Sequence, residues 1–332
     1  MTTIQQAKQI MKLKIVRTCD SIRVVSMTLA SVAFLVGSSF CAQAQLISYD
    51  GFDYTPDTSV ANGSGGTGWG ATWGNVADAA SALATNTSTG LSYGGLVTSG
   101  GAVIVGNPVG TTGTTAQPQR QLPDTFNNLV GGAGGTIWVS FLYQNLNNDL
   151  TGLLGFRETG LRLMSGSSTN AGGWSNRNGT DRLDAGSPNT YPTGANFDQL
   201  TLWTGSTFGT NGFATPRGPD PANTVFIVLR LDFDNTTAAD TGYAWFNPSL
   251  GLEPLLSTAV TNTAADLTSV NALRFQSGNQ NGNGTNAVWI LDEVRVGLSW
   301  ADVSPIPEPT VFVLGGLGAL ALLLRKRGRS RN

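Results

Sequence analysis

The chain has 332 residues, 12% of them charged, with 43 glycines and a formal net charge of −2. It contains no histidine, which excludes a Ser-His-Asp triad and an imidazole-ligated zinc site. The apolar fraction of 40% is large enough to build a hydrophobic core, and the many turn-forming and β-branched residues favour an all-β domain.

The first 44 residues have the three parts of a secretory signal peptide. A basic stretch at 11–17 precedes the apolar run 27–37, and Ala42-Gln43-Ala44 fits the small-x-small pattern at which signal peptides are cleaved. We therefore expect cleavage after Ala44 and export of the remaining chain. The alternative, a permanent membrane anchor, is disfavoured because the apolar run is short and small polar residues follow it.

Both cysteines, Cys19 and Cys41, lie before this cleavage point. The exported chain would therefore have neither a disulfide framework nor a reactive thiol. Cys41 also raises the alternative of a lipoprotein, but Phe40 stands before it, where lipidation signals have a small residue.

The body of the chain, residues 45–304, is acidic. It holds nine arginines, no lysine and 19 acidic side chains, so its formal charge is −10. A body of this charge without a basic patch argues against binding to nucleic acid or to anionic lipid.

The body contains many short runs of apolar and β-branched residues, separated by glycine-rich and polar turns. No long segment has the 3.6-residue period of a helix, and no repeat of fixed length is present. This pattern predicts a single β-sandwich or jelly-roll domain over 45–304. The glycine- and asparagine-rich segment 166–196 is expected to form long loops. The expected strands are 46–54, 95–106, 136–144, 152–165, 197–203, 224–233, 242–247, 271–277 and 287–297.

The expected strand 224–233 indicates which side chains face the core, since alternate residues of a strand point to opposite faces of its sheet. Its two faces are Val225, Ile227, Leu229, Leu231 and Phe233 on one side, and Phe226, Val228, Arg230 and Asp232 on the other. We expect the first set in the core. A carbohydrate-binding protein would present Arg230 and Asp232 on an open, concave sheet face.

Four stretches of the body carry a family resemblance. They are "SYDGFDY" (48–54), "GGTGW" (65–69), "LRLDFDNTTAADTGYAWFNPSLG" (229–251) and "ILDEVRVGLSWADV" (290–303). Together they are similar to concanavalin A-like lectin and glucanase domains of bacterial surface proteins. The resemblance spans most of the body, and it implies a sandwich whose first and last strands pair within one sheet.

The acidic residues decide whether the body is expected to cleave glycans. Glycosidases of this fold hold two carboxylates about 5 Å apart on one strand face. The body has only three glutamates, Glu158, Glu253 and Glu293, which are far apart in the sequence. Asp292 and Glu293 are adjacent, so a regular strand would point them to opposite faces. We therefore predict a protein that is not an enzyme; a glycan-active hydrolase of this fold is the alternative.

The segment 232–240 is the best candidate for a metal site. Asp232, Asp234, Asn235 and Asp240 offer oxygen ligands of the kind that calcium takes. The alternative is a hairpin loop in which these residues only form turns. Calcium held by Asp232, Asp234 and Asp240 is therefore a hypothesis for this loop, and no other cofactor is expected.

Tryptophans in glycine-rich segments are the candidate carbohydrate-binding residues. An aromatic ring can stack on the apolar face of a sugar, and Trp69 and Trp174 lie in segments of this kind. Trp138 and Trp289 lie inside apolar runs and are expected in the core.

The last residues, 305–332, form a separate unit. Pro307-Glu308-Pro309 precedes the apolar segment 311–324, and Arg325, Lys326 and Arg327 begin a basic end. As a helix the apolar segment would be about 21 Å long, shorter than a hydrocarbon core of about 30 Å. It would therefore hold the chain in a membrane only marginally.

This combination of proline clamp, short apolar helix and basic end resembles the PEP-CTERM sorting signal. The resemblance implies that an exosortase-type membrane peptidase recognises the tail and removes it while the protein moves to the cell envelope or extracellular matrix. We therefore expect an exported envelope protein, transiently anchored in the membrane, with a structural or carbohydrate-binding role in surface polysaccharide.

Overall fold

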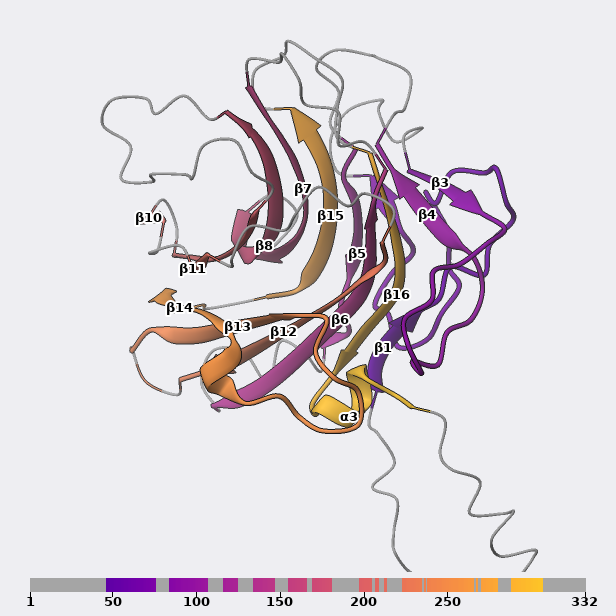
Figure 1. Ribbon diagram of the computed structural model, residues 1–332. Helices are drawn as coiled ribbons and strands as arrows, with labels where there is room; N and C mark the ends of the chain where they lie inside the picture. Colours follow the sequence, from indigo (N-terminus) through magenta and orange to yellow (C-terminus); the bar gives the residue numbers. More distant parts are fainter. Residues whose placement is uncertain are drawn as a thin grey trace, which may run out of the picture. The chain divides into compact units, whose positions relative to one another are not determined.

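A computed structural model of the protein describes residues 46–75, 84–106, 116–124, 134–146, 155–165, 169–180, 197–204, 207–208, 212–213, 223–234, 236, 238–265, 267, 270–279 and 288–306. Within these residues the regular secondary structure is almost all β-strand, as predicted, and long turns and loops connect the strands (Figure 1). The expected signal peptide with Ala42 and Ala44, and the tail from Pro307 onward, lie outside them. In the described ranges no helix combines the length and the apolar character needed to cross a bilayer.

The strands form two antiparallel sheets. Sheet A contains β1 (Leu46–Asp50), β3 (Ala84–Thr87), β4 (Ala102–Val105), β6 (Gly135–Asn145), β12 (Val225–Phe233), β13 (Asp240–Phe246), β14 (Val260–Ala265) and β16 (Trp289–Gly297). Sheet B contains β2 (Gly74–Asn75), β5 (Pro118–Gln121), β7 (Gly155–Ser165), β8 (Thr169–Thr180), β9 (Phe197–Thr204), β10 (Thr207–Phe208), β11 (Gly212–Phe213) and β15 (Ala272–Asn279). The order in sheet A is β14-β13-β12-β6-β16-β4-β3, with β1 on β16, and in sheet B β10-β9-β8-β7-β15-β5-β2, with β11 on β9. The chain is thus an all-β sandwich.

The main core lies between the two sheets and is built from alternate residues of their strands. Val139 and Phe141 of β6 face Leu161 of β7 and Phe275 of β15 across it. The rings of Phe141 and Phe275 meet edge to face, with centroids 5.8 Å apart. The five alternating residues of β12 that were predicted to face the core all belong to it: Val225, Ile227, Leu229, Leu231 and Phe233.

The first and last strands of the body are neighbours, as the resemblance implied. β1 pairs with the carboxyl-terminal half of β16, where Tyr49 lies opposite Arg295 and Asp50 opposite Val294. The amino-terminal half of β16 pairs with β4, and its other edge pairs with β6. The last strand is therefore central in sheet A. Without β16, the strands β1 and β4 would have no connection to β6.

A buried ion pair connects the two sheets. Asp50 at the end of β1 is paired with Arg120 of β5, and the two side chains are 0% and 3% exposed. Asp50 also accepts hydrogen bonds from the Tyr54 hydroxyl and the Trp73 Nε1, both at 2.7 Å, and Arg120 donates to the Gly65 carbonyl at 2.8 Å. A buried ion pair is tolerated when its remaining donors and acceptors are satisfied in this way. The pair therefore fixes the position of β5 relative to β1.

A second, smaller apolar layer covers the outward face of sheet A. Trp138 and Trp245 stack with centroids 5.6 Å apart, and both pack in one cluster with Trp300 of the short helix α3 (Trp300–Val303). Ser299 and Asp302 form a capping box that starts this helix. Trp138 is 2% exposed and Trp289, in the main core, is 0% exposed, so both predictions for these tryptophans are confirmed.

The segment 166–196 is not only loop, contrary to expectation. Residues 169–180 form β8, which pairs with β7 from Ser165 to Gly155 and with β9 on its other edge. The sequence analysis also missed short strands such as β3 and β5. These strands have few apolar residues, so their own composition does not favour a strand. They form because they pair with neighbouring strands, β3 with the equally short β4 and β5 with the longer β15.

We expect Gly68 to be required for stability. Its φ is 75°, and a Cβ at this position would lie 1.8 Å from the carbonyl oxygen of Ile47 in β1. Gly68→Ala should lower the free energy of unfolding by about 2 kcal/mol or more, since a left-handed backbone alone costs a side-chain-bearing residue about 1–2 kcal/mol. In Gly95→Ala a Cβ would meet nothing within 4 Å, so no such loss is expected. Thermal unfolding followed by circular dichroism measures both, and equal melting temperatures would contradict the prediction.

Candidate functional site

A row of polar side chains crosses three strands of sheet B. Arg274 in β15 lies opposite Gln119 in β5 on one side and opposite Arg162 in β7 on the other. Directly opposite residues of antiparallel strands have their side chains on the same face of the sheet. Leu273 and Phe275, on either side of Arg274, belong to the main core, so the row lies on the face that points away from it. We call Gln119, Arg274 and Arg162 the arginine row.

Most of the arginine row is buried although two of its members carry a charge. Arg274 is 7% exposed and Gln119 6%, while Arg162 is half-buried. The Nε of Arg274 donates a hydrogen bond to the Oε1 of Gln119 at 2.9 Å. Burial, together with the nearby charge of Arg162, lowers the pKa of Arg274.

Two positions beside Arg162 are glycines and have no side chain. Gly160 lies opposite Gln276, and Gly173 lies opposite Arg162. A guanidinium group offers planar pairs of N–H donors that match a carboxylate, and a glutamine amide can donate to or accept from a hydroxyl. This face therefore has the chemistry to hold an extended ligand that carries carboxylates and hydroxyls.

Sequence reasoning did not find the arginine row. The available signal was an arginine between two apolar residues, which occurs in the body at 161–163, 229–231, 273–275 and 294–296. On a strand this pattern places the arginine opposite to the core. Which of these arginines face one another depends on the order and register of the strands, and the sequence analysis examined only Arg230.

Arg230 and Asp232, expected on an open polar face, are half-buried and bind each other. The Nε and Nη2 of Arg230 donate to Asp232 at 2.8 and 2.9 Å, and its Nη1 donates to Glu253 at 3.0 Å. The guanidinium lies over the rings of Trp138 and Tyr243, 5.4 and 5.7 Å from their centroids. All three of its nitrogens are therefore engaged in tying the loop after β13 to the outward face of sheet A.

The adjacent carboxylates of β16 face the same neighbouring segment, contrary to the expectation for a regular strand. A β-bulge shifts the register between Asp292 and Arg295, and Glu293 has a φ of 54°. As a result, Asp292 accepts a hydrogen bond from the Leu91 N–H at 2.7 Å and Glu293 accepts one from the Ser99 N–H. Both carboxylates are 0% exposed, so this pair holds the 91–99 segment and cannot contact a polysaccharide.

The buried carboxylate pair predicts a pH-dependent stability. Burial, followed by the charge of Glu293, raises the pKa of Asp292 to about 8. Between about pH 4 and about pH 8 the folded protein then binds a proton that the unfolded chain, with an aspartate pKa of about 3.9, releases. Stability should therefore fall as the pH rises through this window, by up to about 1.4 kcal/mol per pH unit.

Asp292→Asn removes this titration, so its stability should fall less over the same window. Urea unfolding at about pH 5 and about pH 8 measures the difference for both proteins. The same pH dependence in the variant and in the native protein would show that Asp292 does not titrate in this range.

The geometry of the segment 232–240 does not support the calcium hypothesis. Asp240 accepts hydrogen bonds from the N–H groups of Asp234 and Leu267, at 2.7 and 2.6 Å. Asp234 accepts a hydrogen bond within its own turn, and Asp232 is paired with an arginine. The three carboxylates are thus engaged separately, as in the hairpin alternative. Across the described part of the chain, no group of three acidic, histidine or cysteine side chains could hold a metal ion.

The two candidate carbohydrate-binding tryptophans differ in what the structure describes. Trp69 is half-buried, with its ring 6.0 Å from that of Trp73 and 4.8 Å from the Arg120 guanidinium. These contacts hold it against the main core. Trp174 lies opposite Leu161 in the strand register, but its side chain lies outside the described residues. A sugar-binding role for either tryptophan stays a prediction.

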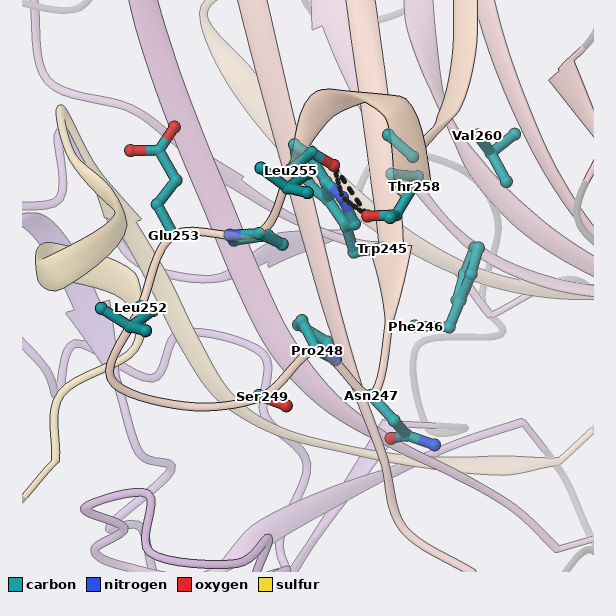
Figure 2. A pocket seen from close by; sticks show the side chains of 13 residues that line it. Trp245, Phe246, Asn247, Pro248, Ser249, Leu252, Glu253, Leu255, Thr258 and Val260 are labelled. Carbon is teal, nitrogen blue, oxygen red and sulfur yellow. Dashed lines mark hydrogen bonds between the residues drawn. The ribbon is translucent and has the colours of Figure 1, made fainter.

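A separate pocket of about 740 Å³ opens beside the end of β13 (Figure 2). Trp245 lines it and donates its Nε1 to the Thr258 hydroxyl at 3.2 Å and to the Leu255 carbonyl at 3.3 Å. The tryptophan is 3% exposed, so its ring is not available to stack on a sugar. The other lining side chains are mostly apolar and include Phe246, Pro248, Leu252, Pro254 and Val260.

No family model and no curated protein matches the chain. Solved structures resemble it at low identity. A β-1,3-1,4-glucanase (lichenase) derived from a mouse hindgut metagenome is 10% identical, with a TM-score of 0.37 over 76% of this chain and 98% of that chain. A variant of alginate lyase A1-II′ is 13% identical, with a TM-score of 0.34 over 63% of this chain and 86% of the lyase chain. The carbohydrate recognition domain of Emp46p, in its potassium-bound form, is 9% identical. Its TM-score is 0.32 over 61% of this chain and 85% of that domain's chain. Similarity at this level concerns the fold alone.

The comparison contradicts the prediction that the chain is not an enzyme. Two of the structures that resemble the chain are named as enzymes, a lichenase and an alginate lyase. The prediction relied on the separation of the glutamates along the sequence. That separation excludes little in a sandwich, because strands far apart in the chain become neighbours, as Arg162 and Arg274 do.

Proposed function

We propose that the protein recognises an acidic polysaccharide along the arginine row of sheet B. The observation that carries this proposal is the pair of facing arginines, Arg162 and Arg274, with Gln119 hydrogen-bonded beside them. The carboxylate of a uronic acid residue would accept N–H donors from the half-buried Arg162 and from Arg274, which is 7% exposed and is reached only if the groups that cover it move aside. The Gln119 amide would then bond to a neighbouring hydroxyl.

Two polysaccharides distinguish this charge-based recognition from a general affinity for sugars. Alginate, named in one of the similar structures, is a polymer of uronic acids. A β-1,3-1,4-glucan, the substrate in the name of another, is uncharged. We expect the purified protein to bind alginate at least about tenfold more tightly, and this preference should weaken at high salt, which screens charge.

Arg274→Gln should weaken alginate binding by about tenfold or more, because a hydrogen bond to a charged group contributes about 1.5–3 kcal/mol. Arg230→Gln is the matched control, since that guanidinium is engaged by Asp232 and Glu253 on the other sheet. Isothermal titration calorimetry measures both affinities, and melting curves check that both variants fold. Equal losses in the two variants, or equal affinities for the two polysaccharides, would refute the proposal.

The same incubations separate recognition alone from catalysis. Shorter oligosaccharides, detected by size-exclusion chromatography, would assign a glycan-cleaving activity to the protein. Intact polysaccharide with retained binding would assign recognition alone. A parallel series with and without calcium tests the calcium hypothesis for Asp232, Asp234 and Asp240 directly.

We also propose that the protein is exported and sorted to the cell envelope by an exosortase-type peptidase. The support is the sequence of the two ends, above all Pro307-Glu308-Pro309 followed by the apolar segment and Arg325, Lys326 and Arg327. Prolines on both sides of Glu308 keep this stretch extended and therefore accessible to a peptidase.

Replacing Pro307, Glu308 and Pro309 with alanine should block tail removal and leave the protein in the membrane at nearly its unprocessed mass. Mass spectrometry of the protein released by cells without these substitutions should show chains that lack residues 311–332. Released chains that still carry the tail would identify it as a plain anchor.

A further inference from the structure

Exposed apolar side chains gather where the tail leaves the body. The loop after β13 carries Leu252, which is 82% exposed, Leu255, which is 71% exposed, and Leu256, which is 40% exposed. Ile306, the last described residue before the tail, is 42% exposed. Exposed leucines are normal when they are scattered, but a contiguous group marks an interaction surface.

Two contacts bring the loop after β13 and the segment around Val97 beside the start of the tail. We call the loop after β13 that carries Leu252, Leu255 and Leu256 the leucine loop. A Cβ on Gly251 would lie 3.7 Å from the Cδ1 of Ile306, so this loop runs beside the start of the tail. The N–H of Val97, a residue that is 44% exposed, donates to the Pro305 carbonyl at 3.0 Å. We call this group the exit surface; it consists of Val97, Leu252, Leu255, Leu256 and Ile306.

The charge at the exit surface suits an apolar partner. Glu253 is the charged residue of the leucine loop, and Arg230 neutralises it at 3.0 Å. Figure 2 shows Leu252 and Leu255 on the same loop, beside the apolar pocket. A partner that buries these leucines therefore does not have to desolvate an unpaired carboxylate.

The tail determines which apolar partner is near. Ile306 is followed by residues 307–310 and then by the apolar segment 311–324. Four extended residues reach at most about 14 Å, and the headgroup layer on each side of a bilayer is about 5–7 Å thick. Proline restricts the residue before it to extended conformations, and this disfavours a tight reversal of the apolar segment onto the exit surface.

We propose that the exit surface lies against the phospholipid bilayer into which the apolar segment 311–324 inserts, with Leu252 and Leu255 among the lipid headgroups. This inference rests on the proposed membrane insertion of the tail. It supplies an interaction that the tail lacks, because a segment of about 21 Å spans a bilayer only marginally. Burial of the leucine loop adds membrane affinity, and it holds the extended Pro307-Glu308-Pro309 stretch at the membrane surface.

A depth-sensitive label tests this contact in the full chain. Cys19 and Cys41 are first replaced by serine, and a fluorescent label is attached to Leu255→Cys. The matched control is a label on Leu146→Cys, since Leu146 is 45% exposed but is not part of the exit surface. In neutral phosphatidylcholine vesicles, brominated lipid should quench the label at 255 at least twofold more than the label at 146.

A second measurement does not depend on labelling. Replacing Leu252 and Leu255 with serine should weaken flotation with the vesicles by about tenfold for each leucine, whereas Leu146→Ser should change nothing. Equal quenching at the two positions, unchanged flotation of the double variant, or no association of the full chain with vesicles would each overturn the proposal. A label at 255 that is protected without vesicles, in a chain of dimeric mass, would assign the exit surface to a second copy instead.

Discussion

The buried ion pair between Asp50 and Arg120 is the constraint on which the candidate site depends. It joins β1 of sheet A to β5 of sheet B, and hydrogen bonds from Tyr54 and Trp73 complete it. The residue before Arg120 points to the opposite face of the same strand, as alternation requires. By fixing β5 through Arg120 inside the core, the chain therefore places Gln119 beside Arg274 on the outward face. Arg120 is paired with a carboxylate in the core, and Arg274 on the outward face donates a hydrogen bond to the Gln119 amide and lies opposite Arg162.

The two outward faces of the sandwich differ in the residues that they carry. On sheet A, an apolar layer and α3 cover the strands, and Arg230 ties down the loop after β13. The buried carboxylates of Asp292 and Glu293 accept hydrogen bonds from the backbone of the 91–99 segment. On sheet B, the polar residues of the arginine row stand on three neighbouring strands. Under the proposed function, a ligand that carries negative charge would find its partners on sheet B, and the exit surface would make a separate contact.

The sequence predicted the class of fold and the pairing of its ends, but not the site. Alternation along 224–233 identified the core face of β12, because a long apolar strand determines its own orientation. It failed for β8 and β5, whose compositions do not favour a strand and whose pairing depends on long neighbours. It also failed at Glu293, because a β-bulge turns the side chain away from the face expected by counting. The arginine row required the register of three strands that are distant in the sequence, which no local pattern provides.

The central claim is that the facing arginines of sheet B hold the carboxylate of a sugar. A crystal structure of the protein with a short uronic acid oligosaccharide tests it most directly. The account predicts a carboxylate within hydrogen-bond distance of the guanidinium groups of both Arg162 and Arg274, with a hydroxyl against Gln119. An oligosaccharide bound elsewhere on the molecule, with these three side chains in contact only with protein and water, would contradict it.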